Sequence, residues 1–222
     1  MCLLFGLAFR KPGVVPRGLQ NVGEVALDVV RLQVIRETLG DERGKKFMPW
    51  LSALFFFVLI GNLFEITPGI HLPYTAVVAI PLLLAVITWL VFIYQGVATH
   101  GAYEYFKMNL FPPGAPKPVY VLLTPIELIS TFVLRPATLT IRLMANFIAG
   151  HLILALFFLA TNYFFLHLVN DVDARWPAVW AIPSFVAGVG FIVFELLVAF
   201  VQAYIFTLLS AVYVAGAMDT EH

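Results

Sequence analysis

Charged side chains are scarce in this sequence, since Asp, Glu, Lys and Arg make up only 12% of its 222 residues. Soluble domains carry about 25% charged residues. With 61% of its residues hydrophobic, the chain is therefore expected to be an integral membrane protein without a soluble domain. The 13 basic residues balance the 13 acidic ones, and this neutral net charge argues against a nucleic-acid partner. A single cysteine, Cys2, excludes an internal disulfide and a thiolate metal site.

Motifs of enzyme chemistry are also missing. The sequence has no His-Glu-x-x-His zinc pattern, no glycine-rich phosphate loop and no nucleophile elbow. We therefore expect no enzyme activity from the chain on its own, no metal site and no cofactor.

The N-terminal part of the chain contains an incomplete apolar span followed by an amphipathic segment. Residues 1–9 are apolar and precede Arg10 and Lys11, which is the reverse of a signal peptide. We interpret them as the remnant of a first transmembrane helix, too short to cross the bilayer. Residues 19–40 have apolar and charged sides at a helical period, as expected for a helix in the membrane interface. An ordinary loop helix without a lipid-binding role is an equal alternative for this segment.

Residues 47–97 contain two uncharged spans and are expected to form a transmembrane hairpin. The first span covers 47–64, and the second covers 72–94 after a short turn at 65–73. Pro81 lies inside the second span, where a membrane helix tolerates it.

Residues 119–218 contain two longer apolar stretches, at 119–168 and 176–218, joined by a loop short enough to make them antiparallel. As helices they would be about 75 and about 65 Å long, against a hydrocarbon core of about 30 Å. Each is therefore expected to break, at Pro136 or at Gly188-Val189-Gly190, or to lie strongly tilted as part of a channel-forming hairpin. The predicted fold class is an all-α integral membrane protein, treated as a single membrane domain.

Basic residues predict the topology of the chain. Ten of the 13 Lys and Arg fall in two segments, 10–46 and 107–117, and the turn at 65–73 has none. The positive-inside rule places both basic segments and the C-terminus in the cytoplasm.

Arg142 lies within apolar sequence that extends well beyond it in both directions. A guanidinium at bilayer depth costs about 2.5–3.5 kcal/mol on insertion scales, and its pKa above about 12 prevents the loss of its charge. Such a residue is expected to be functional and to have a partner, the alternative being an arginine near a helix end that snorkels to the headgroups. At about 100° per residue, Arg142 is expected on a face of polar and small side chains that another helix could approach closely. The other members of this face are Arg135, Thr138, Ala145, Asn146, Ala149 and Ile153.

Glu195 and Gln202 lie seven residues apart and are expected to share a face of the last helix. In an antiparallel pair, facing residues have a constant sum of residue numbers. Arg142 with Gln202 gives 344 and His151 with Glu195 gives 346, so both pairs lie at matching depth. His151 points about 180° away from Arg142, so one pair is expected to be direct and the other to span a water-filled space. Together His151 and Glu195 predict a proton path, although each alone is compatible with a satisfied core residue.

Glu127 precedes Arg142 by about four helical turns, on the cytoplasmic side in this topology. It is expected either to line a second aqueous access path or merely to cap a helix end. The sequence leaves these alternatives open.

Two motifs carry a family resemblance, RPATLTIRLMANFIAGH and FELLVAFVQAYIFTLLSAVY. Further support comes from GLQNVGEVALDVVR, NLFEITPG and TPIELIS. Over nearly its whole length the chain resembles subunit a of the membrane sector of the bacterial rotary (F-type) ATP synthase.

The resemblance implies a first transmembrane helix, an interfacial helix, a transmembrane hairpin and two long tilted helices beside a ring of c subunits. It places the family's invariant arginine at Arg142, its nearby asparagine at Asn146 and its late glutamine at Gln202. Many members carry an acidic residue where this chain has His151 and a histidine where it has Glu195, so the two types are exchanged here. The incomplete first helix departs from the family pattern.

The resemblance also implies a mechanism and partners. The chain would be a proton-channel stator subunit that forms two aqueous half-channels against the c-subunit ring. Arg142 would keep the half-channels apart and deprotonate the ring carboxylate. The other implied partners are the b subunits of the peripheral stalk and the lipid bilayer. The transported ion would be H⁺ or Na⁺, and the location a bacterial plasma membrane.

Two rival functions belong to other classes. A secondary transporter with its substrate at Arg142 would commonly show repeats in related halves, and none is found. An anionic substrate would also require more donors than Arg142 and Asn146 offer. A purely structural anchor leaves a costly buried arginine unexplained.

Overall fold

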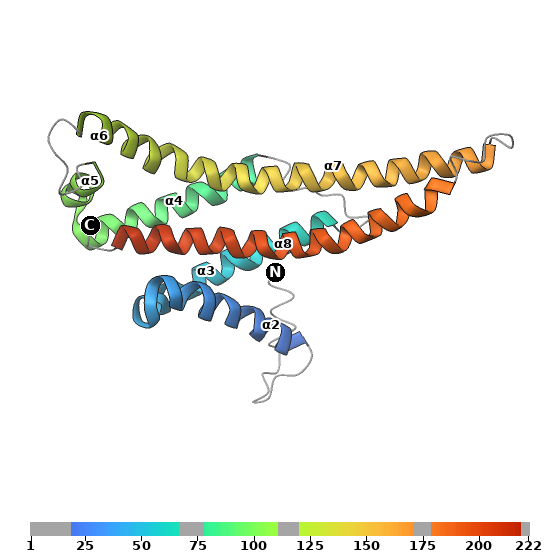
Figure 1. Cartoon of the computed structure of the whole chain (residues 1–222). Coiled ribbons are helices and arrows are strands. Elements are labelled where there is room, and N and C mark those ends of the chain that lie inside the picture. Colours follow the sequence, from blue (N-terminus) through green and yellow to red (C-terminus); the bar gives the residue numbers. More distant parts are fainter. Residues whose placement is uncertain (1–18, 67–77, 111–119, 171–178, 219–222) are drawn as a thin grey trace.

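The computed structural model describes residues 19–66, 78–110, 120–170 and 179–218, which are helical almost throughout and contain no strand (Figure 1). Four helices in these ranges are long and apolar enough to cross a membrane. The predicted all-α integral membrane class is therefore confirmed. The expected helix remnant at 1–9 lies outside the described residues.

The first described segment of the chain consists of α2 (Leu19–Asp28) and the π-helical segment η1 (Val29–Arg36), followed by α3 (Glu37–Ile66). A change of direction occurs at Gly40, which has φ 74° and ψ 171° inside α3. Most side chains adopt such a positive φ only at a cost, whereas glycine has no Cβ to clash with the following carbonyl. The predicted end of the first helix at residue 40 coincides with this turn, while its interfacial location stays a prediction.

The second predicted span is α4 (Ala79–His100), which is followed by α5 (Ala102–Leu110). The predicted span 72–94 is described from residue 78 onward, and α4 contains Pro81 as expected, whereas residues 72–77 lie outside the described residues. Pro81 lies in the first turn, where its missing N–H removes no helical hydrogen bond. α3 and α4 each pack against α8, and they make few contacts with each other.

The third apolar stretch is continuous from α6 (Tyr120–Ile129) through the π-helical segment η3 (Ser130–Leu134) into α7 (Arg135–Asn170). The break expected at Pro136 therefore takes the form of one wide turn just before that proline. In a π turn the backbone hydrogen bonds join residues five apart instead of four. This change in the bonding pattern just before the proline lets the helix continue past it without a sharp kink.

The last helix, α8 (Ala181–Met218), is 38 residues long and runs unbroken through its glycines. The break predicted at Gly188-Val189-Gly190 is therefore wrong. Gly188 instead provides a close approach, since a Cβ built there would lie 3.3 Å from the Cβ of Phe157 on α7. At 1.5 Å per residue α8 is about 57 Å long, so tilting is the remaining way to fit it into a bilayer, and this stays a prediction.

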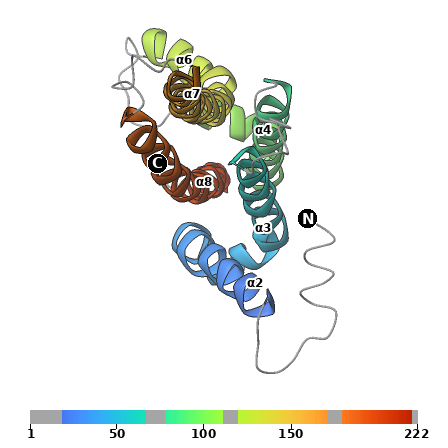
Figure 2. The same cartoon turned by 90° about the vertical axis from the view of Figure 1, so that its right-hand side faces the viewer.

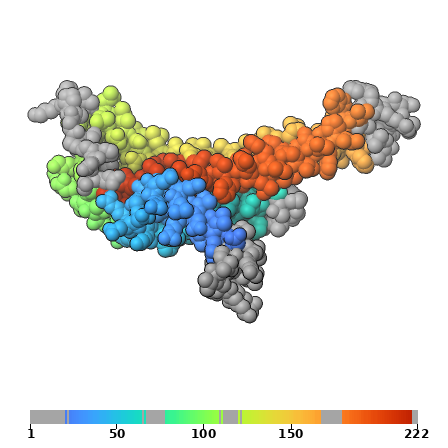
Figure 3. Space-filling model, turned by 60° about the horizontal axis from the view of Figure 1, so that its bottom comes forward, coloured from blue at the N-terminus to red at the C-terminus, as the bar shows by residue number. Residues whose placement is uncertain are grey.

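α8 lies at the centre of the packing and contacts η1, α3, α4 and α7. Figure 2, viewed along the long helices, places α4 beside α7 and α8, with α2 farthest from α7. Phe55, Phe92 and Phe206 are almost completely buried, one each from α3, α4 and α8. The distant ends of α7 and α8 project beyond the N-terminal helices in Figure 3. The site-bearing helices are thus held along only part of their length.

The turn at Gly40 yields a stability prediction. Gly40→Ala should destabilise the folded chain by about 1–3 kcal/mol, because alanine would have to adopt a backbone conformation with positive φ and extended ψ that is essentially restricted to glycine. The matched control is Gly216→Ala, which places a methyl group in open space on helix α8 and should be neutral or stabilising. The measurement is the midpoint of thermal unfolding of the chain in lipid nanodiscs. Equal midpoints for the two variants would contradict the expectation.

Candidate functional site

α7 presents two different faces. Leu139, Leu143, Phe147 and Gly150 are buried and follow one another at helical spacing, so they form the side that packs against the rest of the chain. Arg142 lies outside this buried stripe and is half-buried.

The face predicted around Arg142 is largely open on this chain. Asn146 is half-buried like Arg142, whereas the small and apolar members of the face are exposed. These exposed members are Thr138, Ala145, Ala149 and Ile153. A neighbouring helix could therefore approach α7 closely beside Arg142.

Arg142 has no hydrogen bond or ion pair with any residue in the described part of the chain. A guanidinium has five N–H donors and cannot be deprotonated in a protein. Among the described residues these donors therefore have no acceptor.

On α8, Glu195 and Gln202 lie on the same buried side, each with only 7% of its surface exposed. The shared face expected from their spacing is therefore observed. Between them, the side-chain amide of Asn62 on α3 donates to the carbonyl oxygen of Ala199 at 3.5 Å. The buried Nε2 of Gln202 has no partner among the described residues.

Glu195 lies directly against Gly150 of α7. A Cβ built on Gly150 would overlap the carboxylate of Glu195, so only glycine fits at this point without a shift. Gly150 was not among the predicted site residues, although the signal for it was a small residue next to a candidate proton carrier. The missing side chain is what lets a buried carboxylate reach the backbone of the facing helix.

The register of α7 and α8 follows from two close approaches. Gly150 faces Glu195 and Phe157 faces Gly188, and in both pairs the residue numbers add to 345. Nearby, the hydroxyl of Ser184 donates to the carbonyl oxygen of Phe157 at 3.1 Å. The predicted pairs, with sums of 344 and 346, straddle this value, so their matching depth agrees with the observed register.

His151 does not share the buried environment of Glu195. Its side chain is exposed and stacks on Phe147, with the ring centroids 5.6 Å apart and the planes 10° from parallel. The described structure contains no hydrogen bond between His151 and Glu195. The two groups are therefore brought to neighbouring depths on different sides of the helix pair.

Glu127 is half-buried on α6 and is not brought close to Arg142. Fifteen residues of continuous helix separate them, which corresponds to about 22 Å along the axis. Glu127 and Arg142 therefore lie at different depths along the helix axis.

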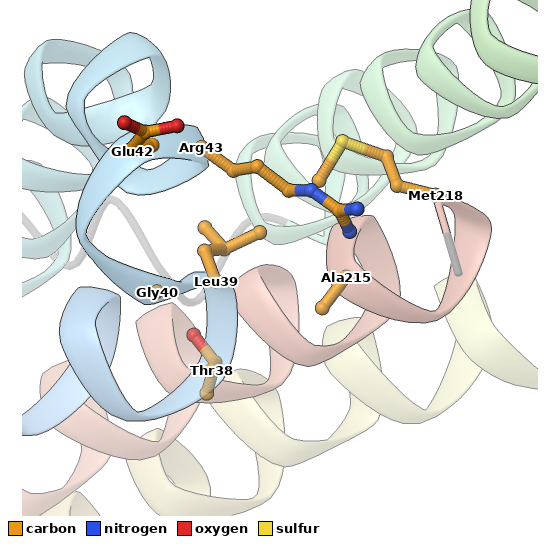
Figure 4. Close-up of a pocket in the computed structure, with 7 residues that line it drawn as sticks. All are labelled: Thr38, Leu39, Gly40, Glu42, Arg43, Ala215 and Met218. Carbon is orange, nitrogen blue, oxygen red and sulfur yellow. The ribbon is translucent and has the colours of Figure 1, made fainter. Parts of the chain in front are cut away.

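A cavity beside the N-terminal helices lies away from the Arg142 region. It has a volume of about 300 Å³ and is enclosed by the Gly40 turn and the end of α8, with Arg43 extending toward Ala215 and Met218 (Figure 4). No described residue of the Arg142 region lines it. Within the described ranges, no group of three His, Cys, Asp or Glu side chains could hold a metal ion.

Sequence comparisons place the chain beside a family of known proteins. Residues 1–215 match the family described as ATP synthase A chain. ATP synthase subunit a of Rhodococcus erythropolis is 46% identical over 217 residues, covering 98% of this chain and 77% of that protein. The subunit a of Frankia alni is 42% identical over 97% of this chain and 72% of its own length. That of Streptomyces lividans is 38% identical, with 98% and 75% covered.

The family is assigned from three observations. The matches cover nearly the whole chain, they agree with one another, and four helices are compatible with a membrane. This chain belongs to the ATP synthase A chain family and is a multi-pass membrane subunit of the proton-translocating sector of an ATP synthase, with no enzyme activity of its own.

Proposed function

We propose that this chain is the stationary channel subunit that couples proton flow to rotation of a c-subunit ring. Arg142 keeps two aqueous half-channels apart and deprotonates the carboxylate of each passing c subunit. The observation that carries this proposal is the position of Arg142, half-buried on the open face of α7 without a partner in the described chain. A permanent cation in such a place requires a counter-charge from another molecule.

The chemistry at Arg142 follows from the cost of charge in lipid. A carboxylate facing hydrocarbon must be neutral, because an isolated charge there costs many kcal/mol. Opposite a guanidinium the ionised form is favoured, so the carboxylate loses its proton as it arrives. Arginine cannot relay that proton itself, and it therefore also blocks direct passage between the half-channels.

The surface beside Arg142 suits a closely packed, moving partner. Ala145 and Ala149 are exposed and small, which would let a second helix backbone come near. Large apolar side chains next to them are exposed as well, including Ile141 at 62% and Leu152 at 63%. A surface that is small and apolar around one cation supports a ring of apolar hairpins as the partner.

We assign the outer half-channel to His151, Glu195, Asn146 and Gln202, and the inner one to the region of Glu127. Support comes from the common depth of Gly150 and Glu195, which places a buried carboxylate at nearly the same depth as the exposed imidazole of His151. Both groups can carry protons, which favours H⁺ over Na⁺ in this chain's own path. The driving force is about 2.3 kcal/mol per charge per 100 mV, plus the contribution of the pH difference.

The proposed orientation has the C-terminus in the cytoplasm. At the cavity, the Gly40 turn with the basic residue Arg43 lies beside the C-terminal end of α8, and α5, which contains Lys107, lies at the same end of the molecule (Figure 1). Grouping of the basic residues at one end is what the positive-inside rule requires. The further proposed partners are the b subunits of the peripheral stalk and the lipid bilayer of a bacterial plasma membrane.

The central test is Arg142→Ala in the complete ATP synthase, reconstituted in vesicles. Proton-driven ATP synthesis should fall to background, because ring carboxylates would no longer be deprotonated or kept from leaking between half-channels. Assembly should persist, since Arg142 makes no hydrogen bond or ion pair with a described residue of the chain. Arg36→Ala, which removes an exposed surface ion pair with Asp41, is the control and should synthesise normally. Normal synthesis in Arg142→Ala would refute the proposal.

Gly150→Ala tests the position of the Glu195 carboxylate. The added methyl group must displace that carboxylate, so proton uptake should slow by about tenfold or more, given that a shift of about 1 Å can cost a hundredfold. Gly190→Ala adds the same atoms to α8 where nothing lies within 4 Å and should leave uptake unchanged. The measurement is ATP-driven acidification of inverted vesicles. Equal rates in the two variants would remove Glu195 from the path.

Glu195→Gln tests whether the carboxylate of Glu195 must exchange a proton, because the substitution keeps the size of the side chain. The amide has nearly the same size but cannot exchange a proton in the required range, so uptake should fall while the complex assembles as before. His151→Ala should also slow uptake, since it removes an imidazole that can accept and donate a proton at nearly the same depth. Initial rates of vesicle acidification at several external pH values provide the measurement. Parental rates in both variants would count against the outer half-channel.

A further inference from the structure

The junction of η3 and α7 contains a backbone carbonyl that the helix itself cannot satisfy. The N–H of Arg135 bonds to the carbonyl of Ser130, five residues back, instead of to that of Thr131. The next residue is Pro136, which has no N–H to offer. Thr131 therefore presents a carbonyl oxygen without a backbone donor in either helical register.

α4 supplies the missing donor. The indole N–H of Trp89 reaches the carbonyl oxygen of Thr131 at 3.1 Å. The same indole packs edge-on against Phe132, with ring centroids 5.8 Å apart. The wide turn before α7 is therefore fixed by a hydrogen bond and a ring contact from a neighbouring helix.

The first residue of α7 is held as well. The guanidinium of Arg135 lies over two aromatic rings, 5.5 Å from the centroid of Phe92 on α4 and 5.3 Å from that of Tyr213 on α8. The two rings are themselves 6.0 Å apart. Phe92 is only 1% exposed, so the cation is anchored on a buried surface and attracted by the ring faces.

Trp89 and Phe92 are three residues apart on α4 and therefore act from one side of that helix. One helix thus contacts both the π turn and the start of α7, while Tyr213 contacts Arg135 from α8. A helix held at its first turn by three side chains from two neighbours cannot rotate about its axis without breaking these contacts.

We propose that Trp89 and Arg135 are positioning residues that set the rotation of α7 and thereby the direction in which Arg142 faces. This inference rests on the proposed role of Arg142. Arg135 and Arg142 are seven residues apart, about 20° short of two full turns, so a rotation at Arg135 is transmitted to Arg142 almost unchanged. Conversion of the π turn to an ordinary α turn would rotate α7 by about 100° relative to α6.

The experiment reads the rotation directly in the complete ATP synthase. Single cysteines at Ala145 and Asn146, which lie about 60° to one side of Arg142 and about 40° to the other, are crosslinked in membranes to a cysteine on the c subunit, and the ratio of the two yields is recorded. Trp89→Phe keeps the ring and removes the donor, and Arg135→Leu removes the cation. Each should change the ratio by about threefold or more, because a rotation by part of about 100° moves one position toward the ring and the other away.

Matched variants separate positioning from loss of packing. Trp50→Phe makes the same substitution in α3, where the indole has no hydrogen bond with a described residue, and should leave the ratio unchanged. Arg135→Lys keeps a cation that can lie over the rings and should restore most of the parental ratio. ATP-driven proton pumping should decline in parallel with the change in ratio, at equal content of the subunit in the membrane.

Two failures have different meanings. An unchanged ratio in both Trp89→Phe and Arg135→Leu, with parental crosslinks intact, overturns the positioning role and leaves the function of Arg142 standing. Absence of crosslinks at both positions in the parental complex overturns the placement of Arg142 against the ring, and the positioning role with it.

Discussion

The close approach of α7 and α8 at Gly150 and Gly188 fixes the depth of the polar side chains in the candidate site. Both glycines allow the facing helix to come nearer than any side chain would, and together they hold one register over seven residues. Glu195 is buried because Gly150 leaves room for it. With this register set, Arg142 lies level with the Gln202 region and His151 level with the Glu195 region.

The two sides of α7 meet opposite requirements. Its buried stripe, with Leu139 and Leu143 only 2% exposed, binds the helix to α4 and α8. Its other side carries Arg142 among small residues and offers that cation nothing to pair with in the described chain. An arrangement of this kind is costly for a chain alone in a membrane and becomes reasonable in a complex that supplies the counter-charge.

Helical periodicity in the sequence predicted much of the site, and prediction failed where the backbone register departs from that period. The face around Arg142, the shared side of Glu195 and Gln202, and the matching depths all depend on about 100° per residue and an antiparallel pair. Gly188 was interpreted as a breaker although its role is close packing, because periodicity cannot distinguish the two. The π turn before Pro136 and its Trp89 donor were missed, since no single-sequence pattern marks an orphaned carbonyl. The membrane location of 19–40 and the roles of the site residues remain predictions.

Arg142, which has no hydrogen-bond or ion-pair partner among the described residues, cannot set its own direction. A buried ion pair would orient Arg142 by its geometry, but here only the packing of α7 can do so. The buried stripe resists lateral displacement, yet apolar side chains of similar size tolerate some rotation, because dispersion forces have little directionality. The hydrogen bond from Trp89 and the ring contacts of Arg135 are directional, and they act about three and two turns before Arg142, respectively. If the counter-charge is on a rotating ring, it cannot hold Arg142 in one direction. The directional contacts near the start of α7 would then have to do so.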